Sequence, residues 1–130
     1  MAHTLIFDIG KTNKKCFLFD KDYQEIYKSY VRFDEAQDED GFPCDDLQAI
    51  ETWLKNTLQQ ALSNRAYNIE AINFSTYGAS FVHLDVNGRV LSPLYNYLKP
   101  FPEDLLEQFY RDHGPAPLLA RQTASPQLGM

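Results

Sequence analysis

The chain has 130 residues and a mass of 15.0 kDa, enough for one domain. A content of 44% hydrophobic and 14% aromatic residues excludes a wholly disordered chain, and no apolar run approaches the roughly 20 residues of a membrane span. The net charge of −6 disfavours a nucleic-acid-binding protein, which would usually present a basic face. Cys16 and Cys44 are too few for a disulfide framework, and the N-terminus has no secretory-signal pattern, so we expect a reduced, cytoplasmic protein without a membrane partner.

The first part of the chain predicts three strands. Compact apolar runs cover residues 4–9 and 15–20, and a third run covers residues 25–33. Because the connections between these runs are short and polar, we expect an antiparallel meander. The next segment, residues 34–46, holds seven acidic residues together with a glycine and a proline. We interpret it as a solvated surface loop.

A long amphipathic helix and a fourth strand are predicted next. Apolar residues recur at steps of three and four between Leu47 and Leu62, which places them on one helical face. Asp45 or Asp46 is the expected N-cap of this helix, which should end near residues 63–64. A strand is predicted over residues 69–75. Since a strand–helix–strand crossover usually joins parallel strands, this fourth strand should run parallel to an earlier one.

The last third of the chain predicts a hairpin and a second helix. An Asn-Gly pair at residues 87–88 lies between the apolar runs 79–84 and 89–91, which is a strong hairpin signal. A helix is predicted over residues 102–113, with a proline near its first turn and Gly114 as its stop. No further element is predicted after it, where the chain is rich in proline, alanine and glutamine.

The segment with the clearest chemistry lies between the first two predicted strands, where residues 8–15 read Asp-Ile-Gly-Lys-Thr-Asn-Lys-Lys. Its Gly-Lys-Thr triplet looks like the end of a P-loop. That motif requires a glycine five positions before Gly10, where this chain has Leu5, and a helix after the loop, where this chain has a strand. The segment is therefore not a P-loop.

A tight turn of this composition can bind an anion. Gly10 lets the backbone approach a phosphate closely, and the side chains of Thr12 and Asn13 add hydrogen-bond donors. Positive charge comes from the lysines at positions 11, 14 and 15. Asp8, at the end of the first strand, is placed to hold Mg²⁺ through water. The alternative is a plain hairpin with a solvated turn, in which the aspartate only satisfies turn amides.

This segment resembles the first phosphate motif of the actin-like ATPase superfamily, which includes sugar kinases, heat-shock chaperones and actin. The motif is usually Asp-x-Gly-Thr-Thr-x-x-Arg/Lys. Asp8, Gly10 and Thr12 match it, and Lys15 fills the basic position, whereas Lys11 stands where threonine is usual. The predicted order of strands and helix is also the opening of that superfamily.

A second group of motifs follows the fourth predicted strand: Thr-Tyr-Gly at residues 76–78, Asn-Gly-Arg at 87–89 and Tyr-Asn-Tyr at 95–97. Their order resembles that of the FGGY carbohydrate kinases, and especially of their rhamnulokinase-like branch. Those enzymes have a Thr-Trp-Gly segment, then a strand, an Asp-Gly-Arg turn and a Tyr-His-Tyr-Arg-Asp segment. Here residues 76–78 read Thr-Tyr-Gly, with tyrosine in place of tryptophan. Tyr95 and Tyr97 match the later segment, whereas Asn96 stands at the histidine and Lys99 at the aspartate.

The resemblance implies an α/β fold: a ribonuclease H-like (actin-like ATPase) half domain. Its mixed sheet would have an antiparallel three-strand opening, a crossover helix and a parallel fourth strand, and residues 1–130 would be the N-terminal portion of the first kinase domain. It implies ATP and Mg²⁺ as cofactors, with Asp8 at the metal and the ATP phosphates at Gly10, Lys11, Thr12, Asn13 and Lys15. It implies that a sugar substrate lies against Thr76, Tyr77, Gly78 and Tyr97, although ordinary packing is the alternative for the tyrosines.

The activity that the resemblance implies is transfer of the ATP γ-phosphate to a hydroxyl of a ketose or related polyol. The catalytic base of this family lies beyond residue 130, so we expect the chain alone to be inactive. We also expect it to self-associate, as a homodimer or larger species, through apolar surface and a sheet edge. Two alternatives stay open: a non-catalytic sugar- or phosphate-binding module, and a structural role through exposed sheet surface.

Overall fold

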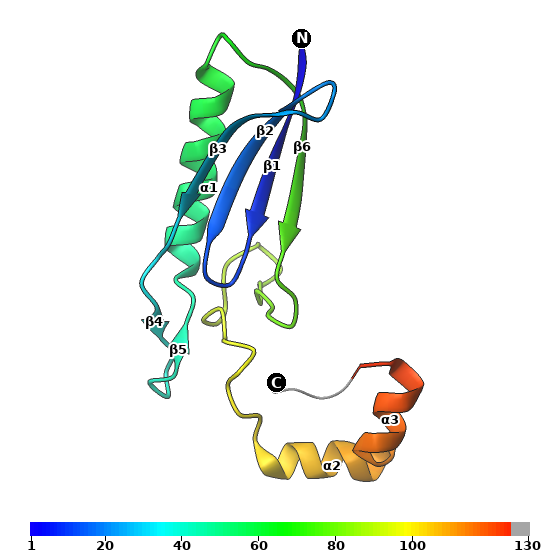
Figure 1. Ribbon diagram of the computed structural model, residues 1–130. Helices are drawn as coiled ribbons and strands as arrows, with labels where there is room; N and C mark the ends of the chain where they lie inside the picture. The colour runs from blue at the N-terminus through cyan, green and yellow to red at the C-terminus, as the bar shows by residue number, and fades with distance from the viewer. Residues whose placement is uncertain (126–130) are drawn as a thin grey trace.

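Four strands form the main sheet of the computed structural model, which describes residues 1–125 (Figure 1). They lie in the order β3-β2-β1-β6, with the bounds β1 (Ala2–Ile9), β2 (Lys14–Asp20), β3 (Glu25–Val31) and β6 (Asn68–Thr76). Strand β2 is antiparallel to β1 and to β3, whereas β6 is parallel to β1. The expected antiparallel opening and parallel fourth strand are therefore confirmed.

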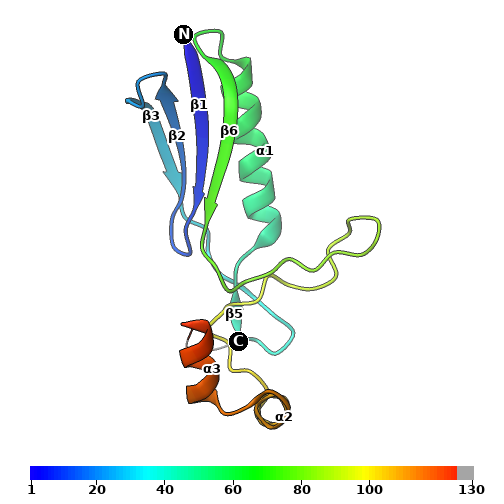
Figure 2. The same cartoon turned by 90° about the vertical axis from the view of Figure 1, so that its right-hand side faces the viewer.

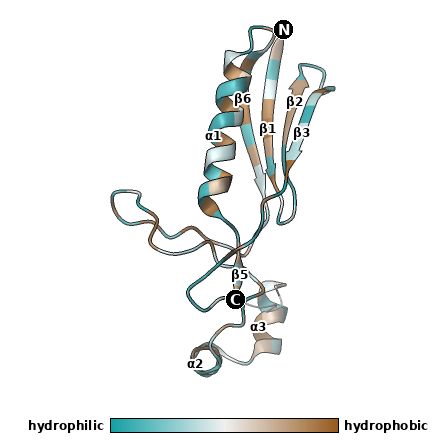
Figure 3. Cartoon of the chain, turned by 90° about the vertical axis from the view of Figure 1, so that its left-hand side faces the viewer, coloured by the Kyte–Doolittle hydropathy of each residue, from teal (hydrophilic) through white to brown (hydrophobic). Residues whose placement is uncertain are grey.

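Helix α1 (Leu47–Ser63) precedes β6 in the chain and covers one face of the sheet (Figure 2). Its N-cap is Asp46, whose side chain accepts a hydrogen bond of 2.9 Å from the backbone N–H of Ala49. Hydrophilic and hydrophobic residues are interspersed along the helix (Figure 3). This amphipathic pattern lets α1 pack against the sheet with one side and meet water with the other.

The core lies between α1 and the two central strands. Its buried side chains are Leu5 and Phe7 of β1 and Cys16 and Leu18 of β2. Trp53 of α1 packs against them, with its ring centroid 5.6 Å from that of Phe7 in an edge-to-face arrangement. Because side chains alternate along a strand, the intervening residues of β1 and β2 point to the opposite face of the sheet. In the described part of the chain, no helix covers that face (Figure 2).

The acidic segment after β3 is only in part the solvated loop that was expected, because five of its seven acidic residues are exposed. It contains a short antiparallel pair, β4 (Ala36–Gln37) and β5 (Pro43–Cys44), and two of its carboxylates are buried. The Asp38 carboxylate accepts hydrogen bonds from two backbone N–H groups of its own turn and from the ammonium of Lys99 at 2.6 Å. The second buried carboxylate, Asp45, also pairs with lysines. The reason for the difference is tertiary, because these lysines are distant in sequence.

The hairpin predicted over residues 79–91 is confirmed only in part: its turn forms and the Leu91 N–H donates to the His83 carbonyl, but the flanking runs do not become strands. Only one isolated bridge, between Leu84 and Val90, closes the turn, in which Gly88 has a φ of +78°. The flanking runs are exposed and extend away from the sheet without a partner strand in the described residues (Figure 2). An Asn-Gly turn formed as the local sequence favours, but nothing packs on the apolar runs to make them strands.

Two helices complete the described chain. Helix α2 (Glu103–His113) ends at Gly114, whose φ is +107°, so the predicted helix and its stop are confirmed. Helix α3 (Ala116–Thr123), which the sequence analysis missed, begins directly after Pro115. Both helices lie apart from the sheet and bury none of their residues (Figure 1). Over residues 1–125, no helix has the length and apolar character that a membrane crossing requires.

Candidate functional site

The turn between β1 and β2 is tight enough to require its glycine. The backbone N–H of Gly10 donates to the carbonyl of Asn13 at 3.0 Å. A Cβ at position 10 would lie 2.8 Å from that same carbonyl oxygen, closer than side chains tolerate. The side chain of Asn13 is also held, because its Oδ1 accepts from Arg32 Nε at 2.6 Å. Thr12, which lies in the turn between Gly10 and Asn13, is exposed.

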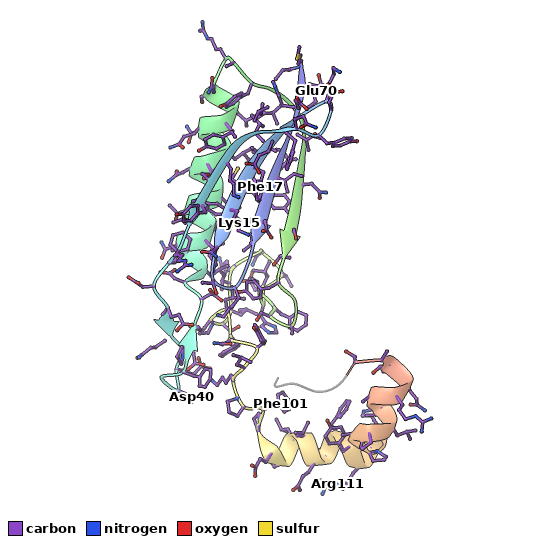
Figure 4. The ribbon with its side chains drawn as sticks, viewed as in Figure 1. Lys15, Phe17, Asp40, Glu70, Phe101 and Arg111 are labelled. Carbon is purple, nitrogen blue, oxygen red and sulfur yellow. The ribbon has the colours of Figure 1, made fainter. Side chains whose placement is uncertain are left out.

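Asp8 and Lys15 face each other across the β1–β2 ladder, on the sheet face that α1 does not cover. They are direct partners in the antiparallel register, and the Lys15 ammonium lies 3.3 Å from Asp8 Oδ2. Both side chains are about one-third exposed, so both can reach a ligand from solvent. Figure 4 shows Lys15 together with Phe17 along β2.

A single carboxylate fits the way in which proteins hold Mg²⁺. This ion binds through one or two carboxylates, keeps several waters and completes its shell with substrate phosphates. Asp8 provides one such carboxylate beside the glycine turn. No cluster of three or more His, Cys, Asp or Glu side chains suited to a metal occurs among the described residues. The donor set therefore suits a phosphate-bound magnesium better than a cage built of protein ligands.

Two of the turn lysines point to the other face of the sheet, where they meet Asp45. The Lys11 ammonium lies 2.6 Å from Asp45 Oδ2, and the Lys14 ammonium lies 3.0 Å from Oδ1. Lys14 also donates to the Lys11 carbonyl at 2.9 Å and is only 2% exposed. Lys14 is therefore a structural residue of the turn, and Lys11 is not a freely solvated cation.

The phenol of Tyr77 donates to the same carboxylate, at 2.8 Å from Asp45 Oδ2. Burial alone would raise the pKa of Asp45, but hydrogen bonds from Lys11, Tyr77 and Lys14 outweigh it and hold the pKa below its ordinary value. Burial first, and then the bond to this carboxylate, raise the pKa of Tyr77. Asp45 is therefore ionised and Tyr77 is protonated at neutral pH.

The residues that the resemblance places at the sugar are Thr76, Tyr77, Gly78 and Tyr97. They lie beside the group formed by Asp45, Lys11 and Lys14. The backbone N–H of Tyr77 donates to the Ile9 carbonyl at 3.1 Å, so the residues after β6 stay next to the end of β1. The ring of Tyr97 lies 6.4 Å from that of Tyr77, and the Lys11 ammonium lies 5.9 Å from the Tyr77 ring. Thr76 and Gly78 are exposed on either side of Tyr77, and a Cβ at Gly78 would meet nothing within 4 Å.

Two positions that differ from the expected family pattern have structural roles here. Asn96 is buried, and its side-chain oxygen accepts from the backbone N–H of Leu98 at 3.0 Å. Lys99 pairs with Asp38 at 2.6 Å and with Asp40 at 2.7 Å. The bond to Lys99 is the main cause that lowers the pKa of Asp38, and the same bond raises the pKa of Lys99. Lys99 thus ties the chain after Tyr97 to the acidic segment.

The structure brings the two predicted groups of site residues to one end of the sheet, where β1 and β6 finish (Figure 1). Asp8 and Lys15 lie on the open face, whereas Lys11, Tyr77 and Tyr97 lie on or near the other side. Asp45 is a site residue that the sequence does not single out, since its segment predicts only an acidic loop and a helix cap. Its sole sequence signal was an excess of lysines in the turn, which need counter-charges if they are buried.

Comparisons with known proteins identify the family. The model of the FGGY family of carbohydrate kinases, N-terminal domain, matches residues 3–112. Rhamnulokinase of Mannheimia succiniciproducens is 36% identical over 59 residues, which are 45% of this chain and 12% of that enzyme. The matched part of the chain therefore spans only about an eighth of the length of this relative.

Solved structures show the same fold. A carbohydrate kinase from Novosphingobium aromaticivorans aligns with a TM-score of 0.71 and 24% identity over 86% of this chain and 23% of its own. Gluconate kinase from Lactobacillus acidophilus gives 0.72 and 19% over 98% of this chain and 26% of its own. Plasmodium falciparum glycerol kinase with ADP gives 0.70 and 16% over 87% and 24%, respectively. The family model matches most of the chain, so this protein belongs to the FGGY family of carbohydrate kinases.

Proposed function

We propose that this chain is the N-terminal portion of the first domain of an ATP-dependent, cytoplasmic carbohydrate kinase. The enzyme would transfer the γ-phosphate of ATP to a hydroxyl of a sugar, a ketose or related polyol. The observation that carries the proposal is that two chemically different groups lie at the end of the sheet where β1 and β6 finish, one on the open face and the other on or near the opposite face. An aspartate–lysine pair beside a glycine turn lies there with two neighbouring tyrosines.

On the phosphate side, we assign direct contacts to the exposed residues of the turn. Thr12 offers a hydroxyl and Lys15 an ammonium, and both are accessible from solvent. Gly10 and Asn13 define the shape of the turn, because their mutual hydrogen bond closes it. Lys11 is paired with Asp45 but retains some exposure, so it can add positive charge to the site.

Asp8 is the residue that would hold Mg²⁺. The bound ion would neutralise negative charge on the transferring phosphoryl group, which is the main catalytic requirement of phosphoryl transfer. The pairing of Asp8 with Lys15 places a carboxylate for the metal and an ammonium for a phosphate on adjacent strands. Solved glycerol kinase from Plasmodium falciparum, which shares the fold, carries ADP.

On the sugar side, Tyr77 and Tyr97 supply aromatic faces that can pack on the C–H face of a sugar ring. The Tyr77 hydroxyl is already committed to Asp45, so its ring and not its hydroxyl would contact substrate. The Thr76 hydroxyl donates to the Tyr77 carbonyl at 3.1 Å but can still accept a hydrogen bond from a sugar hydroxyl, and the backbone at Gly78 is open to a ligand. A wrong sugar that left such a polar group unpaired would lose ~1–3 kcal/mol of binding.

The proposal is tested in the complete enzyme, with ADP release measured over a set of ketoses, aldoses and polyols. We expect Asp8→Ala to lower kcat by roughly 10²–10³-fold, because the charge that Asp8 organises matters most in the transition state. The KM for sugar should change little. Asp22→Ala is the matched control, since Asp22 is an exposed turn carboxylate paired with Lys21. An unchanged kcat for Asp8→Ala would refute the metal assignment.

A second substitution separates the sugar side from the phosphate side. We expect Tyr97→Ala to raise the KM for sugar roughly tenfold and to leave the KM for ATP nearly unchanged, because an aromatic platform contributes similar binding in ground and transition states. Tyr30→Ala, on the exposed edge strand β3, is the control. Equal losses for both substrates would mean that Tyr97 serves only in packing.

A further inference from the structure

One carboxylate connects three segments of the candidate site. Asp45, 9% exposed, accepts from Lys11 and Lys14 of the β1–β2 turn and from the Tyr77 hydroxyl after β6. Its backbone also forms an isolated antiparallel bridge with Leu94, three residues before Tyr97. The phosphate-side turn and both sugar-side tyrosines are therefore linked to this residue.

The bonding pattern of Asp45 differs from that of its neighbour. Asp46 caps α1, so its side chain serves the element that it begins. Among the described residues, the side chains that donate to Asp45 all come from other segments. Lys11 and Lys14 belong to the β1–β2 turn, and Tyr77 follows β6. A buried carboxylate whose two oxygens are both occupied by charged or hydroxyl donors holds those donors in defined positions.

We propose that Asp45 is a positioning residue of the site, which fixes the Lys11 ammonium of the β1–β2 turn and the Tyr77 ring beside each other. This role rests on the proposed kinase function. Removing the carboxylate would leave two ammonium groups without their counter-charge and the phenol without its acceptor. Both substrate sites would then lose order together, although Asp45 itself touches neither substrate.

The first test reads the geometry without requiring activity. In the complete protein, 3-fluorotyrosine is introduced at position 77 and its ¹⁹F resonance is recorded. We expect Asp45→Asn to shift this resonance, because an amide cannot replace a carboxylate shared by two ammonium groups and a phenol. Asp46→Ala, which weakens the N-cap of α1, is the control and should leave the resonance in place.

The second test is kinetic. We expect Asp45→Asn to raise the KM for ATP and the KM for sugar by about tenfold each, as expected for lost hydrogen bonds to a charged group. Tyr77→Phe removes one bond, keeps both ion pairs and should raise only the KM for sugar. In the double variant, the loss for sugar should equal that of Asp45→Asn alone, because the two residues act through one contact. Asp46→Ala should lower stability without changing either KM.

The outcomes separate this inference from the proposed function. A ¹⁹F shift with both KM values raised and non-additive losses supports it. An unmoved resonance overturns it, and so do unchanged KM values or additive losses in an active enzyme. If Asp45→Asn does not fold, Tyr77→Phe decides, since an unchanged KM for sugar would overturn the inference. If the wild type phosphorylates no sugar, the proposed function fails, and the resonance alone decides whether Asp45 positions Tyr77.

Discussion

The two halves of the molecule differ in what they bury. Residues 2–76 form a sheet and a helix around a shared core. Residues 77–125 contribute one buried apolar side chain, Leu94, and their helices α2 and α3 bury none. This second half is held to the first by polar contacts, such as Lys99 with Asp38 and the hydroxyl of Tyr95 with Glu39. The comparison teaches that helix signals in a sequence act locally, whereas a core requires a second surface to pack against.

The largest expected effect is a difference in stability between matched leucine truncations in the two halves. Leu18→Ala, in the centre of the core, should lower the free energy of unfolding by about 2–5 kcal/mol through lost burial and a cavity. Leu105→Ala, on the exposed face of α2, should change it by less than about 0.5 kcal/mol. Urea unfolding followed by circular dichroism measures both. Equal losses would mean that α2 packs on a surface in solution and would break the comparison.

A smaller effect is expected from pH, because a buried carboxylate connects the two halves. The pKa of Asp45 is lower in the folded protein than its ordinary value of about 4. The stability that this group contributes is therefore present above about pH 4 and is lost as pH falls through the lower folded value. We expect the wild type to lose stability more steeply than Asp45→Asn when urea unfolding is measured from neutral pH down to about pH 3. If the free energy of unfolding fell equally with pH in both proteins, the lowered pKa of Asp45 would be contradicted.

The smallest expected effect is a weak, reversible self-association of the chain. Strand β6 is at the edge of the sheet, and its Phe74 is 57% exposed. On α2, Phe109 is also largely exposed. In sedimentation experiments, the average mass of the wild type should grow with protein concentration. Phe74→Lys should reduce this growth more than Phe109→Lys does. Val86→Lys, at a fully exposed turn position, is the control. A constant monomer mass would refute this prediction.

Patterns that depend on local periodicity were predicted well from the sequence. The strands predicted from the apolar runs of residues 4–9 and 15–20, the helix predicted from steps of three and four, and the stop at Gly114 all appear in the structure. Helix α3 was missed because its eight residues begin beside two prolines, which usually mark a loop. The hairpin over residues 79–91 was overestimated, since a favourable turn does not make strands without a surface on which they can pack.

Within the candidate site, resemblance and residue chemistry located the turn and the segment after β6, and the fold brought them to one end of the sheet. The partners of the lysines could not be predicted in this way. Lys11 and Lys14 precede Asp45 by 34 and 31 residues, respectively. The lysine-rich turn indicates that counter-charges are needed, but the sequence does not show which carboxylate provides them, because the acidic segment holds seven of similar appearance.

The amino-acid sequence by itself determined the four strands of the main sheet, helix α1, their parallel crossover and the composition of the phosphate turn. These features follow from hydrophobic periodicity and from the conformational limits of glycine, which act over a few residues. Only the tertiary structure decided that Lys11 and Lys14 turn toward Asp45, whereas Lys15 faces Asp8 on the other side of the sheet. The reason is physical: a buried charge must find its counter-charge wherever the fold places one.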